Sequence, residues 1–224
     1  MVSPYRKPLS IVAGGSVKDQ RPPTMLAGGP QQLDALVLLD RVETGEVTAT
    51  RLDLVDSMAA LVPHTSGLSS LPRPLHRLAR LIADCGGAIR LRYSEAAEVD
   101  LATVIARCAK RTLPWSDVVD DMQDDRAQAP SGAMVRAEYT DAIEAGGDLT
   151  VFAGDRLLRL SPVAATVWRL CAIATTPDAI APKLGLAPDI VREVASELID
   201  RDLLRYAARV EPDRSGPTPP LPPC

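Results

Sequence analysis

The sequence of 224 residues is poor in aromatic side chains, which make up only 3% of it. Any hydrophobic core must therefore be built mainly from Leu, Val, Ile and Ala, which the hydrophobic content of 46% allows. Lysine is also scarce, since four of the 25 basic residues are lysine and the rest are arginine; we attribute this ratio to coding bias. The net charge of -4 excludes a general attraction to nucleic acid or to an anionic membrane.

Cysteine is rare as well, and its four copies, Cys85, Cys108, Cys171 and Cys224, are widely scattered. They form no CxxC pair, and no histidine lies near them at the spacing of metal ligands. We interpret them as small core residues in a reducing compartment. The N-terminus has no signal-peptide pattern, and no apolar run approaches the length of a membrane span. The sequence predicts a cytoplasmic protein that uses no metal, cofactor or membrane.

Changes in composition divide the chain into five parts. Residues 1–32 are rich in Pro and Gly and predict extended backbone and turns. Residues 33–112 predict a first domain. Residues 113–132 are acidic and predict a linker. Residues 133–206 predict a second domain, and residues 207–224 predict a Pro-rich, disordered tail.

The first domain is predicted to mix helices and strands. Leu33–Asp40 is a continuous apolar run of strand length, which indicates a strand buried on both faces. Pro72–Cys85 is an amphipathic helix pattern that ends at two glycines, and Ile89–Tyr93 alternates like a strand. A strand buried on both faces needs more sheet than this segment supplies. Homodimerisation, or docking on another protein, would provide it.

The second domain shows the order hairpin, helix, helix, helix. Ala153-Gly154-Asp155 predicts a hairpin turn, and Ser161-Pro162 predicts the start of a helix with Ser as the N-cap. A second helix is expected over Pro177–Leu184, ending at Gly185, and a third begins near Asp189. The predicted fold class is therefore α+β, with a small mixed domain followed by a winged-helix-like domain of a three-stranded sheet and three helices.

The run "DRLLRLSPVAATVWRLC", followed by "TPDAIAPKLG" and "VREVASELIDRDLLR", resembles the PqqD family of recognition elements for ribosomally made, modified peptides. The resemblance covers residues 134–206. It implies that a precursor's leader peptide adds a strand to the sheet at Met134–Ile143 and packs against the helix Asp189–Asp200. It also implies a peptide-modifying enzyme as a second partner and no chemistry in this chain. The peptide-binding residues predicted on this basis are Val135, Arg136, Ala137, Glu138, Tyr139, Ile190, Arg192, Glu193 and Glu197.

The runs "LDALVLLDR" and "PLHRLARLIADCGGAIRLRYSEAAEV" are similar to the C-terminal half of HPr kinase-like proteins. The family's phosphate-binding loop, G-x-x-x-x-G-K-[ST], is absent, because Gly14-Gly15-Ser16-Val17-Lys18 has its composition without its spacing. We therefore expect a non-catalytic fragment here. The alternative is that the chain is the C-terminal part of a peptide serine kinase whose start lies upstream.

A second alternative is a winged-helix DNA-binding regulator. The order of helices supports it, but the candidate recognition helix carries five acidic residues against two arginines, which opposes binding to phosphates. We therefore expect no nucleic acid partner.

The sequence gives little indication of a catalytic arrangement. His64 and His76 lie near Ser66, Ser69 and Ser70, but no G-x-S-x-G elbow and no third triad member accompanies them. We predict His76 to lie on the exposed side of its helix. We interpret Arg73, Arg77 and Arg80 as a solvated helix face, and the paired aspartates at 120–121 and 124–125 as linker rather than as a calcium site.

Overall fold

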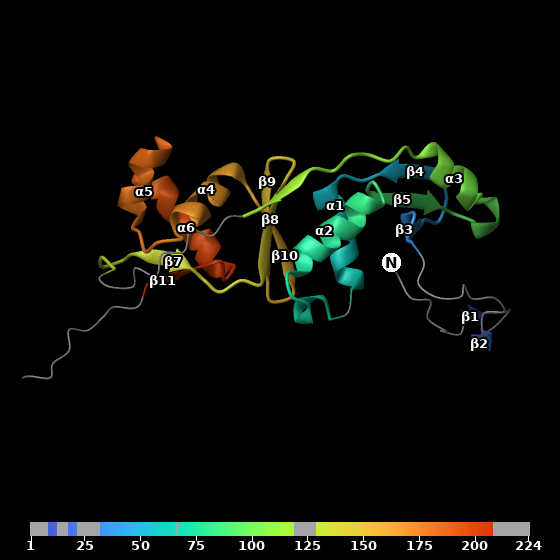
Figure 1. Cartoon of the computed structure of the whole chain (residues 1–224), viewed down its shortest axis with the longest axis horizontal. Helices are drawn as coiled ribbons and strands as arrows, with labels where there is room; N and C mark the ends of the chain where they lie inside the picture. The colour runs from blue at the N-terminus through green and yellow to red at the C-terminus, as the bar shows by residue number, and fades with distance from the viewer. Residues whose placement is uncertain (1–8, 13–17, 22–31, 66, 119–128, 208–224) are drawn as a thin grey trace, which may run out of the picture. The chain divides into compact units, whose positions relative to one another are not determined.

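The computed structural model describes residues 9–12, 18–21, 32–65, 67–118 and 129–207, and its fold class is α+β, as predicted (Figure 1). Two compact units are present, and each is described by itself. Unit 1 consists of the described residues up to Ser57 together with Arg80–Leu113. Unit 2 consists of Met58–Ala79 and the described residues from Pro114 onward.

Unit 1 contains a three-stranded sheet in the order β3-β5-β4. The central strand β5 runs parallel to β3 and antiparallel to β4. A separate antiparallel pair, β1 and β2, lies near the N-terminus. The bounds of the elements up to residue 107 are β1 Leu9–Val12, β2 Lys18–Arg21, β3 Leu36–Arg41, β4 Thr48–Arg51, α1 Leu54–Leu61, η1 Val62–His64, η2 Leu68–Ser70, α2 Pro74–Asp84, β5 Ala88–Tyr93, η3 Ala96–Glu98 and α3 Leu101–Arg107.

Strand β3 differs from its prediction in burial. The strand exists, but it is half-buried at Leu36 and exposed from Leu39 to its end, not buried on both faces. The physical reason is its position at the edge of the sheet, where β5 is its one strand neighbour among the described residues. Leu39 is 67% exposed, although Leu91, its register partner on β5, is 1% exposed.

Arg51 organises the interior of unit 1. Its side chain is buried, and its Nη1 donates to the carbonyls of Cys85, Gly86 and Gly87 at 3.0, 3.3 and 2.8 Å. Its Nη2 donates to the carbonyl of Cys108 at 2.7 Å. These carbonyls follow the ends of α2 and α3, where unsatisfied acceptors and the helix dipole favour a cation.

Unit 2 is built on a four-stranded antiparallel sheet in the order β10-β9-β8-β6, beside a pair formed by β7 and β11. Its sheet has one strand more than predicted because residues 115–117, from the predicted linker, form β6 against β8. The remaining bounds are β6 Trp115–Asp117, β7 Met134–Arg136, β8 Asp141–Ala145, β9 Asp148–Ala153, β10 Arg156–Leu160, α4 Pro162–Leu170, α5 Pro177–Leu184, α6 Pro188–Asp200 and β11 Leu204–Tyr206.

The three helices after the hairpin begin and end where the residue types predict. Ser161 and Thr176 are N-caps whose hydroxyls accept from the backbone N–H three residues later, and each is followed by Pro at the first helical position. Gly185 ends α5 with φ +65°, a conformation that suits glycine. On α6, Val191, Ala195 and Leu198 are buried, and they join one core cluster with Trp168 and Val151.

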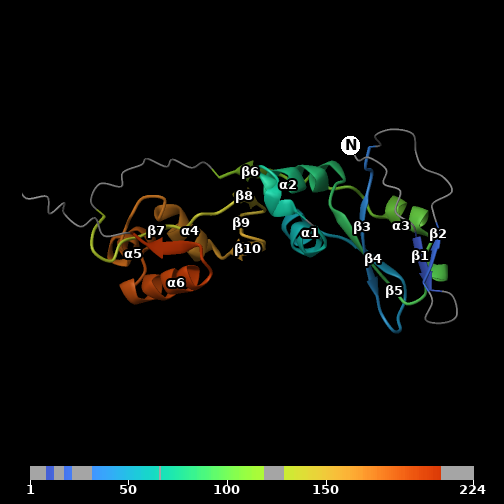
Figure 2. The ribbon, with the colours of Figure 1, turned by 90° about the horizontal axis from the view of Figure 1, so that it is seen from below.

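The opposite face of this sheet is also covered. Ile143, Thr150 and Phe152 are buried, and their register places them on the face turned away from that core. The first half of α2 packs here, because His76 contacts Asp141 on β8. Figure 2 shows the start of α2 beside the strands β6 and β8. The sheet of unit 2 is therefore a layer between helices.

Several predictions fall outside the described residues. They concern the glycine-rich segment Gly14–Val17, the paired aspartates at 120–121 and 124–125, and the tail beyond residue 207. In the part of the chain that the structure describes, no helix is both long and apolar enough to cross a bilayer.

Candidate functional site

The candidate site is the outer edge of β10 in unit 2. The sheet ends in β10 on one side and in β6 on the other, and each has one strand neighbour among the described residues. β10 has five residues and β6 has three, so β10 offers the longer edge. An exposed strand edge can accept an extended peptide as a further strand.

The geometry of the hairpin decides which groups of β10 point outward. Ala153 and Arg156 are partners across the two-residue turn Gly154-Asp155, and such a pair exchanges both of its hydrogen bonds. Hydrogen-bonded and non-hydrogen-bonded pairs then alternate, so Leu158 faces β9. The N–H and C=O of Leu157 therefore point to the outer edge.

The middle of β10 carries two leucines, Leu157 and Leu158, between Arg156 and Arg159. Leu158 packs against the core cluster, and Leu157 is half-buried on the other face. Arg156 donates to the carbonyl of Arg201 at 3.2 Å and to Asp202 at 3.1 Å, which places the end of α6 beside the start of β10. A peptide on this edge would meet a half-buried leucine on each face and the end of α6.

The predicted binding residues on β7 lie in a strand whose two edges are already used. On one side, β7 pairs with β11, with Val135 opposite Arg205. On the other side, the N–H groups of Met134 and Arg136 donate to the carbonyls of Thr175 and Cys171 at 2.7 and 2.9 Å. The predicted edge strand Met134–Ile143 is two strands, β7 and the start of β8, and residues 137–140 between them are not a strand.

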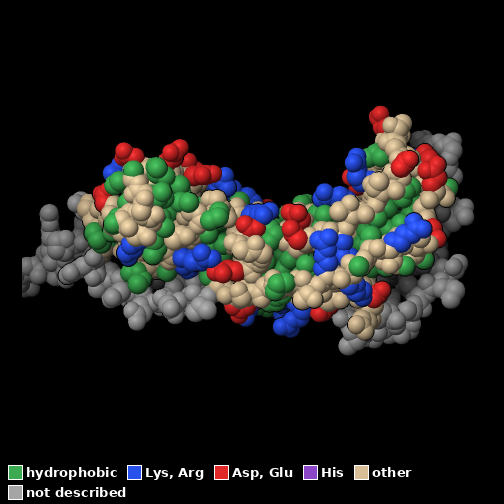
Figure 3. Space-filling model, turned by 90° about the horizontal axis from the view of Figure 1, so that it is seen from above, with side chains coloured by type: hydrophobic (Ala, Val, Ile, Leu, Met, Phe, Trp, Pro, Cys, Tyr) green, Lys and Arg blue, Asp and Glu red, His purple; other side chains and the backbone are tan. Residues whose placement is uncertain are grey.

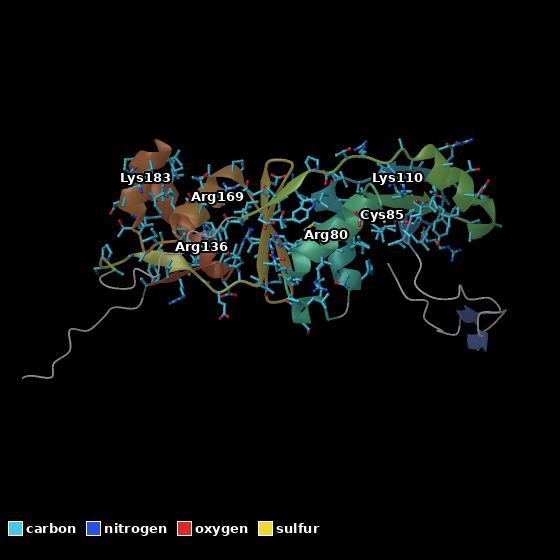
Figure 4. The ribbon with its side chains drawn as sticks, viewed as in Figure 1. Arg80, Cys85, Lys110, Arg136, Arg169 and Lys183 are labelled. Atoms are coloured by element: carbon cyan, nitrogen blue, oxygen red, sulfur yellow. The ribbon has the colours of Figure 1, made fainter. Side chains whose placement is uncertain are left out.

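The side chain of Arg136 is held in place by contacts with α4. Its guanidinium lies 3.8 Å from the centroid of the Trp168 ring, and its Nε donates to the Trp168 carbonyl at 2.9 Å. Its Nη2 donates to the carbonyl of Arg169 at 3.1 Å, at the end of α4. Figure 4 shows Arg136 and Arg169 close to this helix. Tyr139 packs edge-on against Trp168 at 5.1 Å, Ala137 donates to Leu203, and Glu138 is exposed.

The predicted binding residues on α6 are exposed. Ile190 is 46% exposed and Glu193 lies on the same outer surface. Arg192 pairs with Asp178 on α5 and with Asp189, which raises the pKa of its guanidinium further. Glu197 pairs with Arg201 one turn later at 2.5 Å. These residues therefore lie together on one helix, whereas Val135 and Arg136 lie on β7 and Ala137 directly follows it.

A histidine cluster in unit 2 was not predicted. His76 has a side chain that is 12% exposed, so the prediction of an exposed position was wrong. Its Nδ1 lies 2.8 Å from Oδ1 of Asp141, and its Nε2 lies 2.7 Å from Oδ1 of Asp117. Arg73 completes the cluster with an ion pair to Asp117 at 2.8 Å. The aspartates come from β8 and β6, so no local sequence signal could have found this cluster.

The cluster attaches the start of α2 to the sheet. The backbone N–H of His76, in the first turn of α2, donates to Oδ2 of Asp141 at 3.1 Å, so a carboxylate of β8 occupies the helix N-terminus. The ring of Trp115 packs edge-on against His76 with centroids 5.2 Å apart. Asp117 accepts from Arg73, and this hydrogen bond holds the pKa of the Asp117 carboxyl below its ordinary value of 3.8.

The described residues do not assemble a metal centre. They contain no group of three or more His, Cys, Asp or Glu side chains arranged to hold a metal ion. Cys171 lies fully buried in the core, and this burial raises the pKa of its thiol to about 12, so the reactive thiolate is suppressed. No protein-family model, curated protein or solved structure matches the chain.

Proposed function

We propose that this protein binds a peptide in extended conformation by adding it as a strand to the outer edge of β10. The observation that carries the proposal is the position of β10 at the end of the sheet, with β9 as its one strand neighbour among the described residues. Backbone hydrogen bonds to the edge supply affinity, and Leu157 and Leu158 supply contacts for alternate side chains.

The resemblance of residues 134–206 to peptide-recognition elements leads us to propose the occupant. It is the leader segment of a ribosomally made precursor, which the protein delivers to a modifying enzyme as an adaptor with no chemistry of its own. Three cysteines, Cys85, Cys108 and Cys171, have free thiols, which fits work in the reducing cytoplasm.

The DNA-binding alternative has less support from the surface of α6. The exposed acidic residues of this helix include Glu193 and Asp200, and its Arg192 already pairs with two aspartates. In Figure 3, acidic side chains gather along one margin of the part of the molecule that holds the three C-terminal helices. Such a surface opposes the phosphate contacts that dominate affinity for DNA.

The test uses labelled leader peptides encoded by genes beside this one. The full chain is titrated into each peptide, and binding is measured by fluorescence polarisation. We expect saturable binding, and we expect Leu157→Pro to weaken it at least tenfold, because Pro removes the outward N–H while the bonds to β9 remain. Leu157→Ala is the matched control, since it shortens the side chain and keeps the N–H. Circular dichroism checks that each variant is folded.

Two results would overturn the proposal. If none of the neighbouring leader peptides binds, the leader-recognition function fails. If a peptide binds the Pro and Ala variants equally well, strand addition at β10 fails.

A further inference from the structure

A second open edge lies in unit 1, on β3. This strand has β5 as its one strand neighbour in the described part of the chain, and its first four residues are apolar. Edge strands usually carry lysine, proline or a bulge that prevents pairing with another molecule. β3 has no lysine and no proline, and its register with β5 runs without a bulge. It also carries the most exposed large hydrophobic side chain among the described residues, Leu39.

The hydrogen bonds of β3 determine which residues face outward. The N–H of Val42, just after β3, donates to the carbonyl of Tyr93 on β5 at 2.9 Å. Groups on a strand alternate between its two edges, so the backbone groups of Leu36, Leu38 and Asp40 face β5. Those of Val37 and Leu39 point to the open edge.

A second copy of the chain is self-complementary with this edge. When two copies pair antiparallel about a two-fold axis, residues whose backbone groups point to the open edge must lie opposite each other. Since these are the odd-numbered residues of β3, the two residue numbers of every opposed pair add up to an even number. With Leu38 opposite Leu38 of the second copy, Val37 faces Leu39 and Leu36 faces Asp40. The three central pairs are then entirely apolar.

The neighbouring registers oppose less compatible side chains. Shifting the centre to Val37 places Asp34 opposite Asp40, and like charges directly opposite each other are destabilising. Shifting the centre to Leu39 places Leu38 opposite Asp40 and Val37 opposite Arg41, which opposes apolar and charged side chains. The register centred on Leu38 avoids the opposed aspartates, keeps its three central pairs apolar and leaves the apolar–charged pair of Leu36 and Asp40 at its ends. It also covers Leu39 with Val37 of the second copy.

We propose that two copies of this chain associate through β3, antiparallel and centred on Leu38, to form one continuous six-stranded sheet in the order β4-β5-β3-β3-β5-β4. The contact is separate from the proposed peptide-binding edge on β10. Because a pair of short strands buries less area than a standard interface, the dimer is expected to be weak and dependent on protein concentration.

The first test is sedimentation equilibrium of the full chain over roughly 1 to 200 µM, a range that suits a small interface. The wild type should shift from monomer to dimer as its concentration rises. Leu39→Lys should move the midpoint at least tenfold higher, because each partner would carry a charge beside the other's Val37. Thr50→Lys is the matched control, since Thr50 is exposed on β4, at the other edge of the same sheet.

The second test maps the register by oxidation of single cysteine variants, in a background with Cys108 and Cys224 replaced by Ser. Leu38→Cys should form an intermolecular disulfide readily, because directly opposed residues in a non-hydrogen-bonded pair have Cα atoms about 4.5 Å apart. Thr50→Cys should not. A wild type that stays monomeric over the whole range overturns the proposal. So does cross-linking that is faster at Val37→Cys or Leu39→Cys than at Leu38→Cys.

Discussion

At the scale of single residues, the two units use different chemistry to hold their helices. In unit 2, the start of α2 is attached by carboxylates, with Asp141 at the helix N-terminus and Asp117 shared by His76 and Arg73. In unit 1, Arg51 gathers the ends of two helices through neutral carbonyls.

The Asp117 ion pair should stabilise the fold in a pH-dependent way. Hydrogen bonding to Arg73 lowers the pKa of this carboxyl in the folded chain relative to the unfolded chain. A lowered folded pKa contributes stability above the unfolded value, and this stability is lost as the pH falls through the folded value. The difference in unfolding free energy between wild type and Asp117→Asn should therefore be largest near neutrality and shrink as the pH falls below 3.8 toward the lowered folded value.

Urea unfolding at a series of pH values measures this difference. Glu46→Gln serves as the control, because Glu46 is an exposed carboxylate in the segment between β3 and β4. A gap between wild type and Asp117→Asn that stays constant from neutral to acidic pH would contradict the assignment.

The roles of some of these residues could be predicted from the sequence, and the roles of others could not. The caps Ser161 and Gly185 follow from local rules and were predicted, because capping depends on neighbours along the chain. The burial of His76 was predicted wrongly, because it depends on Asp117 and Asp141, which lie 41 and 65 residues away. Arg51 was not singled out for the same reason, since its acceptors lie 34 to 57 residues away.

At the scale of elements, helix α4 depends on a single capping side chain. The hydroxyl of Ser161 accepts from the N–H of Ala164 at 3.3 Å. Ser161→Ala should lower the free energy of unfolding by about 1 kcal/mol, the usual contribution of an N-cap, and Ser161→Asp should restore most of it. Chemical denaturation followed by circular dichroism measures both. Equal stability of all three proteins would show that the cap contributes nothing.

Element types were easier to predict than strand partners. The hairpin β9–β10 and the three helices after it were predicted from turn residues, caps and periodicity. The four-stranded sheet was not, because β6 pairs with β8 across residues that the acidic composition marked as linker. The two edges of β7 were likewise assigned incorrectly, because Thr175 and Cys171, which cover one of them, are distant in sequence.

At the scale of the whole molecule, the C-terminal segment should not be independent of the rest of unit 2. A fragment of residues 133–206 lacks β6 and the first half of α2, so it would expose Ile143 and Phe152, which are at most 1% exposed in the full chain. We expect the fragment to melt at a lower temperature and to bind a hydrophobic dye such as ANS. A fragment of residues 58–79 joined to 114–206 by a flexible linker should keep the higher melting temperature and should not bind the dye. If both fragments behave alike, α2 is not needed to cover the sheet.

The burial of Arg51 has a practical consequence for following the protein. Arg51 is 7% exposed, so dicarbonyl reagents that modify guanidinium groups can reach it only when unit 1 opens. The exposed arginines of unit 1, such as Arg90, would be labelled at once. The delayed labelling of Arg51, read by mass spectrometry after the exposed arginines of unit 1 have reacted, would then measure the rate of local opening of this unit.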